Sequence, residues 1–174
     1  MQIPASILER VLQAAEGRLG ESSATTPAGV TYERPAALVC RSPLAPGEPG
    51  ELPRMAVVLA QPPEKLGETG ELRAPGSVTS EVFAAVVCQV EGSNESGAPG
   101  LDTLLDPLRS WAIIALLYDW TEPRPFGGLV ERAEYVGARW DRDQAGVPFG
   151  EVMLFFRFQL ATDAADPTTL SPVA

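Results

Sequence analysis

The stretch Glu151-Val-Met-Leu-Phe-Phe-Arg-Phe-Gln-Leu160 decides the fold, because its side chains alternate in character with a period of two. One set is apolar throughout: Val152, Leu154, Phe156, Phe158 and Leu160. The intervening set mixes apolar and polar residues: Met153, Phe155, Arg157 and Gln159. A period of two is typical of a β-strand with one buried face. The pattern therefore predicts a strand over 151–160 whose aromatic face lies in the core.

The segments just before this strand predict its neighbours. Residues 129–140 predict a second strand, joined to the first by a turn at 141–146. Before them, residues 101–119 place apolar side chains at helical spacing: Leu101, Leu104, Leu105, Leu108, Ala112, Ala115 and Leu116. Proline is unfavourable inside a helix. We therefore expect Asp106 to be the N-cap and Pro107 the first helical residue, with 101–105 forming a separate turn.

The first half of the chain predicts one helix and three strands. Residues 4–19 carry apolar side chains at a spacing of three and four, which predicts an amphipathic helix, and 21–33 predict a loop. Three apolar runs predict strands at 36–41, 55–60 and 81–90. The proline- and glycine-rich connectors at 42–51 and 62–77 are long for a compact domain, so we expect them to make contacts with neighbouring molecules.

These elements predict a single α+β domain over residues 1–160, with the order α-β-β-β-α-β-β. We expect a mostly antiparallel sheet of about five strands, with both helices packed on one of its faces. Residues 161–174 show no periodicity and are expected to be a mobile C-terminal tail.

The charge of the chain argues against two classes of partner. The formal net charge is −10 over 174 residues, and no lysine- or arginine-rich run is present. Binding of a nucleic-acid backbone or an anionic membrane surface needs concentrated positive charge. The longest apolar run, residues 111–118, is far shorter than the ~20 residues of a membrane span. We expect neither a nucleic-acid-binding protein nor a membrane protein.

The chain also lacks the residues on which most catalytic sites depend. Histidine is absent, which removes the commonest general base, nucleophile partner and metal ligand. Asp141, Asp143 and Gly146 resemble part of a calcium loop, but Ala145 and Val152 stand where two further ligands are required, so a hairpin tip is the better interpretation. We predict no catalytic, cofactor-binding or metal-binding residue, no cofactor, and no enzymatic activity.

Other candidate residues have ordinary structural interpretations. Asp102 and Asp106 lie one helical turn apart, where acids favour the start of a helix. The Gly127-Gly128 pair has no phosphate-binding spacing and is typical of a tight entry to a strand. The three tryptophans, Trp111, Trp120 and Trp140, have no basic neighbourhood for base stacking and are expected to pack in the core or at an interface. Cys40 and Cys88 lie in apolar runs and are expected to be buried and reduced.

Two stretches carry a resemblance to a known family. Glu51-Leu-Pro-Arg-Met-Ala-Val-Val-Leu59 resembles the strand that follows the first hairpin in phage tail terminator and tail-completion proteins. Pro125-Phe-Gly-Gly-Leu-Val-Glu-Arg-Ala-Glu-Tyr-Val-Gly-Ala-Arg-Trp140, with Gly146-Val-Pro-Phe-Gly-Glu-Val-Met-Leu-Phe-Phe-Arg-Phe158, is similar to their closing hairpin. The order of elements also matches over nearly the whole chain, whereas the long connectors depart from the family pattern.

The resemblance implies a structural virion protein and not an enzyme. Such proteins form a ring, here expected to be a homohexamer, at the head-proximal end of a long phage tail or tail-like particle. The ring ends polymerisation of the tail-tube protein and joins the tail to the neck or head-completion protein. Six copies at −10 each carry a formal charge of −60. DNA sliding through the lumen of such a ring would meet a wall that does not bind phosphate.

The implied location is the neck region of the virion tail, with assembly in the host cytoplasm. Two alternatives remain open on the sequence. One is another neck or tail-completion protein of the same particle, which shares the strand pattern. The other is a small soluble enzyme or ligand-binding domain that uses the cleft between the sheet and a helix.

Overall fold

The structure is a computed structural model, and it describes residues 7–45, 48, 50–60, 71–74, 77–118, 125–143 and 148–163. Its helical elements are α1 (Ile7–Gly20), α2 (Leu101–Leu117) and a 3-10 turn η1 (Pro125–Gly128). Its strands are β1 (Ser23–Thr25), β2 (Thr31–Glu33), β3 (Leu38–Cys40), β4 (Arg54–Leu59), β5 (Glu71–Ala74), β6 (Ser77–Glu91), β7 (Arg132–Asp143) and β8 (Phe149–Asp163). The predicted α+β class is confirmed.

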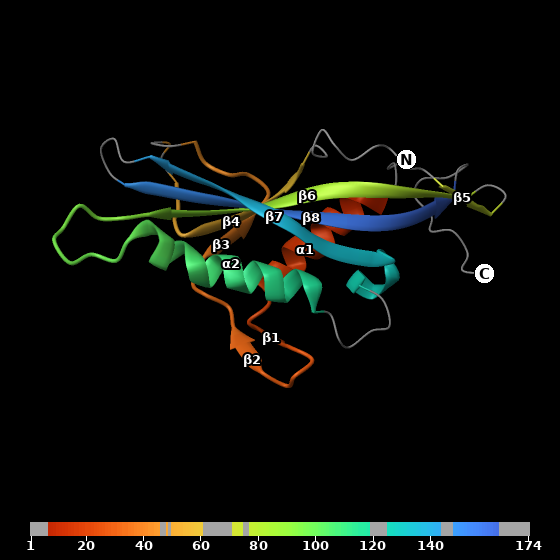
Figure 1. Cartoon of the computed structure of the whole chain (residues 1–174), viewed down its shortest axis with the longest axis horizontal. Helices are drawn as coiled ribbons and strands as arrows, with labels where there is room; N and C mark the ends of the chain where they lie inside the picture. The colour runs from red at the N-terminus through yellow and green to blue at the C-terminus, as the bar shows by residue number, and fades with distance from the viewer. Residues whose placement is uncertain are drawn as a thin grey trace, which may run out of the picture.

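The main sheet is built around two long strands, β6 and β8, each of 15 residues (Figure 1). Its strand order is β3-β4-β6-β8-β7, with β5 paired to β6 as a sixth strand. β3 runs parallel to β4 and every other pair is antiparallel, so the sheet is mostly antiparallel as predicted. β1 and β2 form a separate two-stranded hairpin that extends beyond α2, away from the sheet.

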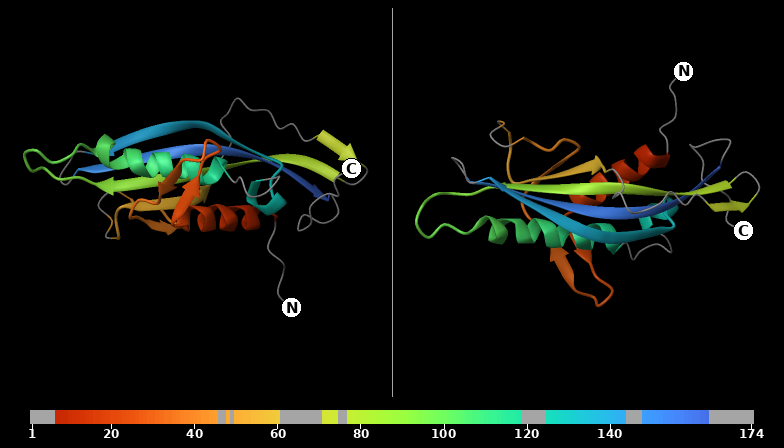
Figure 2. Two further views of the ribbon diagram at one scale, coloured as in Figure 1. Left: turned by 90° about the horizontal axis from the view of Figure 1, so that it is seen from below. Right: turned by 45° about the horizontal axis from the view of Figure 1, so that its top comes forward.

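Both helices pack on the same face of the main sheet. In the left view of Figure 2 they lie side by side in front of the strands. α2 covers β6 and β8, whereas α1 covers β4 and β3. The apolar face predicted for β8 forms the floor of this core, and its five residues are at most 2% exposed: Val152, Leu154, Phe156, Phe158 and Leu160. The register assigned to β8 from its alternation is therefore correct.

Two hydrogen bonds join the helices where α1 ends. The indole nitrogen of Trp111 donates to the carbonyl of Leu19 at 3.0 Å. The guanidinium of Arg18 donates to the carbonyl of Tyr118 at 3.3 Å. Tyr118 is the C-cap of α2, and the last turn of that helix has no basic residue of its own. Arg18 therefore supplies from α1 the positive group that a helix C-terminus favours.

The predicted start of α2 is wrong. The helix begins at Leu101, is preceded by Gly100 as the N-cap, and contains Pro107 in its interior, so Asp106 is not a cap. An interior proline costs about 3 kcal/mol. Leu101 and Leu105 are both buried, at 9% and 0% exposure. Burial of two leucines contributes about 1.5–3 kcal/mol each, enough to hold the turn before the proline in the helix.

Four other segments differ from their prediction. Residues 21–33, predicted as a loop, contain the β1–β2 hairpin. The connector predicted at 62–77 contains β5 and the start of β6; its residues 62–70, 75 and 76 lie outside the described part. The strands around the predicted turn at 141–146 are longer, because β7 continues to Asp143. β8 likewise continues to Asp163, inside the predicted tail, and residues 164–174 lie outside the described part. β1, β2 and β5 were missed because strands of three or four residues are too short to establish a period.

Candidate functional site

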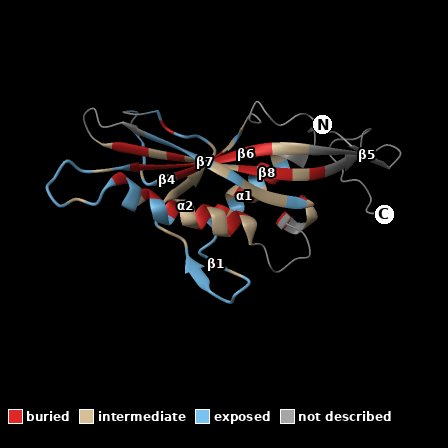
Figure 3. Ribbon diagram, viewed as in Figure 1, coloured by how far each residue is buried: buried red, intermediate tan, exposed pale blue. Residues whose placement is uncertain are grey.

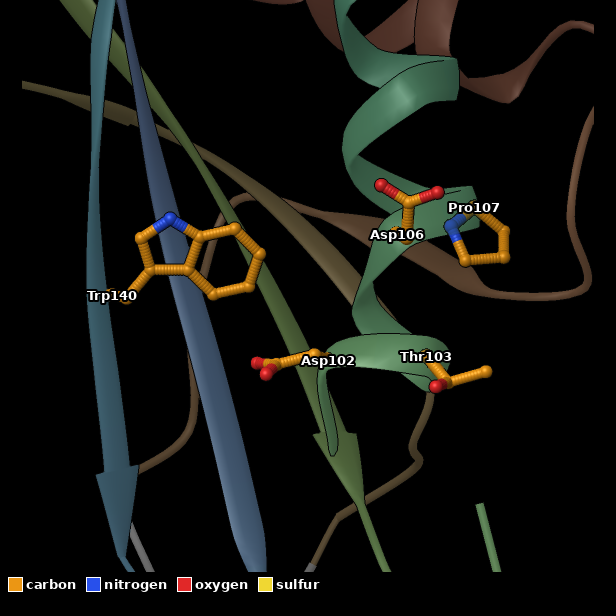
Figure 4. Close-up of a pocket in the computed structure, with 5 residues that line it drawn as sticks. All are labelled: Asp102, Thr103, Asp106, Pro107 and Trp140. Carbon is orange, nitrogen blue, oxygen red and sulfur yellow. The ribbon is translucent and has the colours of Figure 1, made fainter. Parts of the chain in front are cut away.

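A groove of about 600 Å³ lies between the start of α2 and the edge strand β7. Its lining residues are Asp102, Thr103, Asp106, Pro107 and Trp140. Figure 4 shows the indole of Trp140 facing α2 across this space, with the carboxylate of Asp102 extending toward the strands and that of Asp106 lying along the helix. Trp140 is 41% exposed, which is high for so large an apolar side chain. The groove therefore offers one aromatic wall and one acidic wall.

A β-bulge in β7 places Trp140 in this groove. Tyr135 pairs with Phe156 and Gly137 pairs with Phe155, so Val136 is an extra residue without a partner on β8. One extra residue exchanges the two faces of everything that follows it. Gly137 has φ +155°, a conformation that favours glycine. As a result Trp140 pairs with the buried Val152 and faces the helices, although the sequence places it in step with the outward-facing Glu134.

The groove continues along α2 into a second hollow of about 190 Å³. Pro107 lines both hollows; the second is also lined by Tyr32, Glu33, Pro35, Ser110, Trp111 and Ile114. It separates α2 from the β1–β2 hairpin, where Val30 is 47% and Tyr32 is 43% exposed. Figure 3 shows this hairpin as an exposed feature beside the buried face of α2. Because they share Pro107, the two hollows follow one another along α2, from Trp140 to Tyr32.

On the helix-free side of the sheet, Gln89 fixes the chain after β3. Gln89 is fully buried, and its side-chain oxygen accepts from the amide of Leu44 at 2.9 Å. Its side-chain nitrogen donates to the carbonyl of Leu44 and to a carboxylate oxygen of Glu151, both at 2.7 Å. The amide side chain thus pairs with Leu44 as a neighbouring strand would, and holds part of the connector 42–51 against the sheet.

A row of ion pairs crosses the same side of the sheet. Arg157 on β8 bonds to Glu134 on β7 and lies 3.7 Å from Glu81 on β6. Arg132 joins the row through a 2.6 Å contact with Glu134. The hydrogen bond that Arg157 donates to Glu134, together with the charges of Glu134 and Glu81, raises the pKa of Arg157. Two arginines and two glutamates balance in charge, which makes the row a structural link between strands.

The other residues singled out in the sequence contribute to packing or to turns. Trp111 is buried at 2% exposure, as packing required, while Trp120 lies outside the described residues. Gly128 ends η1 with φ +85°, a left-handed backbone conformation that glycine adopts readily and other residues rarely do. Cys88 is fully buried, and burial, aided by the charge of Glu151, raises its thiol pKa to about 12. Cys40 is a free thiol of intermediate exposure.

Asp102 and Asp106 are the two sequence-derived candidates that the structure brings together with Trp140. Asp106 forms an ion pair with Arg109, with 3.6 Å between the charged groups. Sequence reasoning missed Gln89 and the exposed pair Val30 and Tyr32. Gln89 interrupts an otherwise apolar run, which is the signal that was available for it.

Comparison with known proteins adds no family. The chain matches no protein-family model, and no curated protein matches it significantly. Among the described residues, no group of three or more histidine, cysteine, aspartate or glutamate side chains is arranged to hold a metal ion. In the same part of the chain, no helix has the length and apolar character to cross a bilayer.

Proposed function

We propose that this chain is the subunit of a ring, most consistent with a hexamer, at the head-proximal end of a phage tail or tail-like particle. In this role it ends growth of the tail tube and connects it to the neck. The sequence resemblance in the strand 51–59 and in the closing hairpin supports the family, and the structure supports a protein that contacts neighbours.

The observation that carries the proposal is the projecting β1–β2 hairpin. It pairs with no strand of the main sheet, and its side chains are largely exposed. An isolated two-stranded hairpin is marginally stable in water. Val30 and Tyr32 nevertheless expose much of their apolar surface at its tip and second strand. A neighbouring subunit that covers them would stabilise the hairpin, and closed rings provide such repeated contacts.

The polar side chains of the sheet fit this role. Gln89, Glu151 and the Arg157 row link segments of the chain to one another, at distances typical of structural hydrogen bonds and ion pairs. They rigidify a subunit whose contacts lie at its exposed edges.

The decisive experiment is imaging of tails assembled in cells that make this protein. We expect a closed ring at the end of the tube nearest the head. The paired variant Val30→Lys with Tyr32→Lys should keep the thermal melt of the wild type and give tails of uncontrolled length. Leu59→Lys, at a position 57% exposed on β4, is the matched control. Absence of the protein from the tail, or a ring at another position, refutes the proposal.

A further inference from the structure

We propose that the groove between α2 and β7 is a docking site for an extended, arginine- or lysine-bearing segment of a different protein. This inference rests on the proposed function, because the partner would be another protein of the same tail. It specifies the kind of partner that one surface of the ring subunit binds. Three features of the groove carry it: an exposed aromatic wall, an acidic wall and an open strand edge.

The aromatic wall is Trp140, which the bulge at Val136 turns toward α2. At 41% exposure the indole is only partly covered and leaves a large apolar surface open to solvent. The face of an indole ring attracts a cation, and arginine uses it more often than lysine. The opening of about 600 Å³ is large enough for a long side chain lying over the ring.

The acidic wall is formed by Asp102 and Asp106, one helical turn apart on α2. Both side chains are exposed; the carboxylate of Asp102 extends toward the strand side of the groove, and that of Asp106 lies along the helix one turn further on (Figure 4). Arg109 pairs with Asp106 at 3.6 Å, longer than a close hydrogen bond, so an incoming guanidinium has room to compete. A planar cation between the carboxylates and the indole matches both walls at once.

The open edge is the part of β7 after its bulge, residues 137–143. In the described part of the chain, β7 pairs with β8 alone, so its other side is an edge of the main sheet. An extended segment adds to such an edge through main-chain hydrogen bonds, while its alternate side chains reach one face of the sheet. Alternate side chains of that segment would enter the groove beside Trp140.

A second copy of this chain fits the groove poorly. Of the arginines whose side chains the structure describes, three are exposed: Arg10, Arg132 and Arg139. Arg139 precedes Trp140 on β7, beside the groove itself, and a ring contact joins two different patches of the subunit. Arg132, at the far end of β7, is already paired with Glu134. That leaves Arg10 on α1 as a single exposed cation. The sequence also has no two adjacent basic residues, so a different protein is the better donor.

The test measures binding of a labelled peptide to the whole purified protein. Fluorescence anisotropy of fluorescein-Arg-Thr-Arg-Thr-Arg-Thr-amide should show saturable binding that weakens as salt is raised. The equivalent Glu-Thr peptide should not bind. Asp102→Asn with Asp106→Asn should weaken binding about tenfold, and Trp140→Ala by a similar factor. Hydrogen exchange in residues 137–143 should slow when the Arg-Thr peptide is bound.

The control removes the same charge elsewhere. Glu16→Gln with Glu21→Gln neutralises two acids on and after α1 and should leave peptide binding within about twofold. Equal losses in both double variants would mean attraction by net charge alone, and this overturns the groove. No binding of the Arg-Thr peptide overturns it as well.

Two further outcomes separate this inference from the proposed function. Self-association of the wild type that the Asp102→Asn and Asp106→Asn changes abolish would assign the groove to a second copy, against the inference. A ring seen at the tail end together with no peptide binding leaves the function standing and removes the docking site. Peptide binding by a protein that is absent from tails would leave the docking site standing and refute the proposed function.

Discussion

The two faces of β8 are held in different ways. On the helix side, Phe156 and its neighbours are packed into a continuous apolar core and are almost wholly buried. On the other side, Arg157 and Gln159 are half-buried and are held by named polar partners on β6 and β7. Apolar packing is non-directional and depends on filled volume, whereas hydrogen bonds and ion pairs depend on single partners. The helix side therefore maintains the fold, and the other side fixes where individual segments lie.

The largest expected effect is on the helix side. Phe156→Ala removes a fully buried ring that stacks with Phe158 at 6.5 Å between centroids, and it should cost about 3–5 kcal/mol of unfolding free energy. Most small domains have only about 5–15 kcal/mol in total, so we expect insoluble or largely unfolded protein. Urea denaturation of the soluble fraction measures the loss. Phe156→Leu, which keeps most of the volume, should fold and lose much less.

Gln89→Leu should give the next largest effect, on the opposite side. The change leaves the amide and the carbonyl of Leu44 and the carboxylate of Glu151 without their buried partner, which costs about 1–3 kcal/mol. Hydrogen exchange of the Leu44 amide should become fast. Gln159→Leu is the matched control, since the side chain of Gln159 makes only a 3.4 Å contact with Glu81. An unchanged Leu44 amide would show that Gln89 does not fix this segment.

Arg157→Ala should cost less, about 1 kcal/mol, because partly exposed ion pairs contribute little. The variant should remain folded and soluble, and high salt should narrow its difference from the wild type, as salt screens the pairs. Thermal melts at low and high salt provide the measurement. A loss for Arg157→Ala greater than that for Phe156→Ala would mean that the two sides of β8 have exchanged roles.

The smallest effect concerns chemistry and not stability. With its pKa raised to about 12, the thiol of Cys88 stays protonated at pH 8.5, where an ordinary thiol is partly ionised. Iodoacetamide should therefore alkylate Cys40 in the folded protein and reach Cys88 only after denaturation, as mass spectrometry would show. Above about pH 9 the unfolded thiol ionises first, so this group lowers stability as the pH rises. Cys88→Ala should remove that part of the loss. Alkylation of Cys88 in the native protein would contradict its burial.

The sequence was most informative where packing is regular. The alternation from Val152 to Leu160 predicted the buried face of β8 correctly, because every second residue must enter the core. Trp140 could not be placed in the same way. A single extra residue in β7, Val136, has no partner on β8 and reverses the alternation after it. No pattern in the sequence shows where this bulge lies. Its acidic companions Asp102 and Asp106 were noted, but only the fold brings them opposite the indole.

Other elements were missed because local preferences were outweighed by packing. The rule that proline begins a helix failed at Pro107, since Leu101 and Leu105 on the preceding turn are drawn into the core. The β1–β2 hairpin was missed for the opposite reason, because it packs too little to impose an apolar pattern. Gln89 shows a third case, in which a polar residue takes part in the fold through a partner 45 positions away.

The seam between α1 and α2 bears on how the chain is made. α1 leaves the ribosome first, yet the two hydrogen bonds at its end join Leu19 to Trp111, 92 positions later, and Arg18 to Tyr118, 100 positions later. These contacts of the first helix therefore cannot form until most of the chain has emerged. The closing strand β8, on which α2 packs, is made later still. A truncated chain lacking β8 would not present a native surface, so unfinished copies would be excluded from any assembly that recognises it.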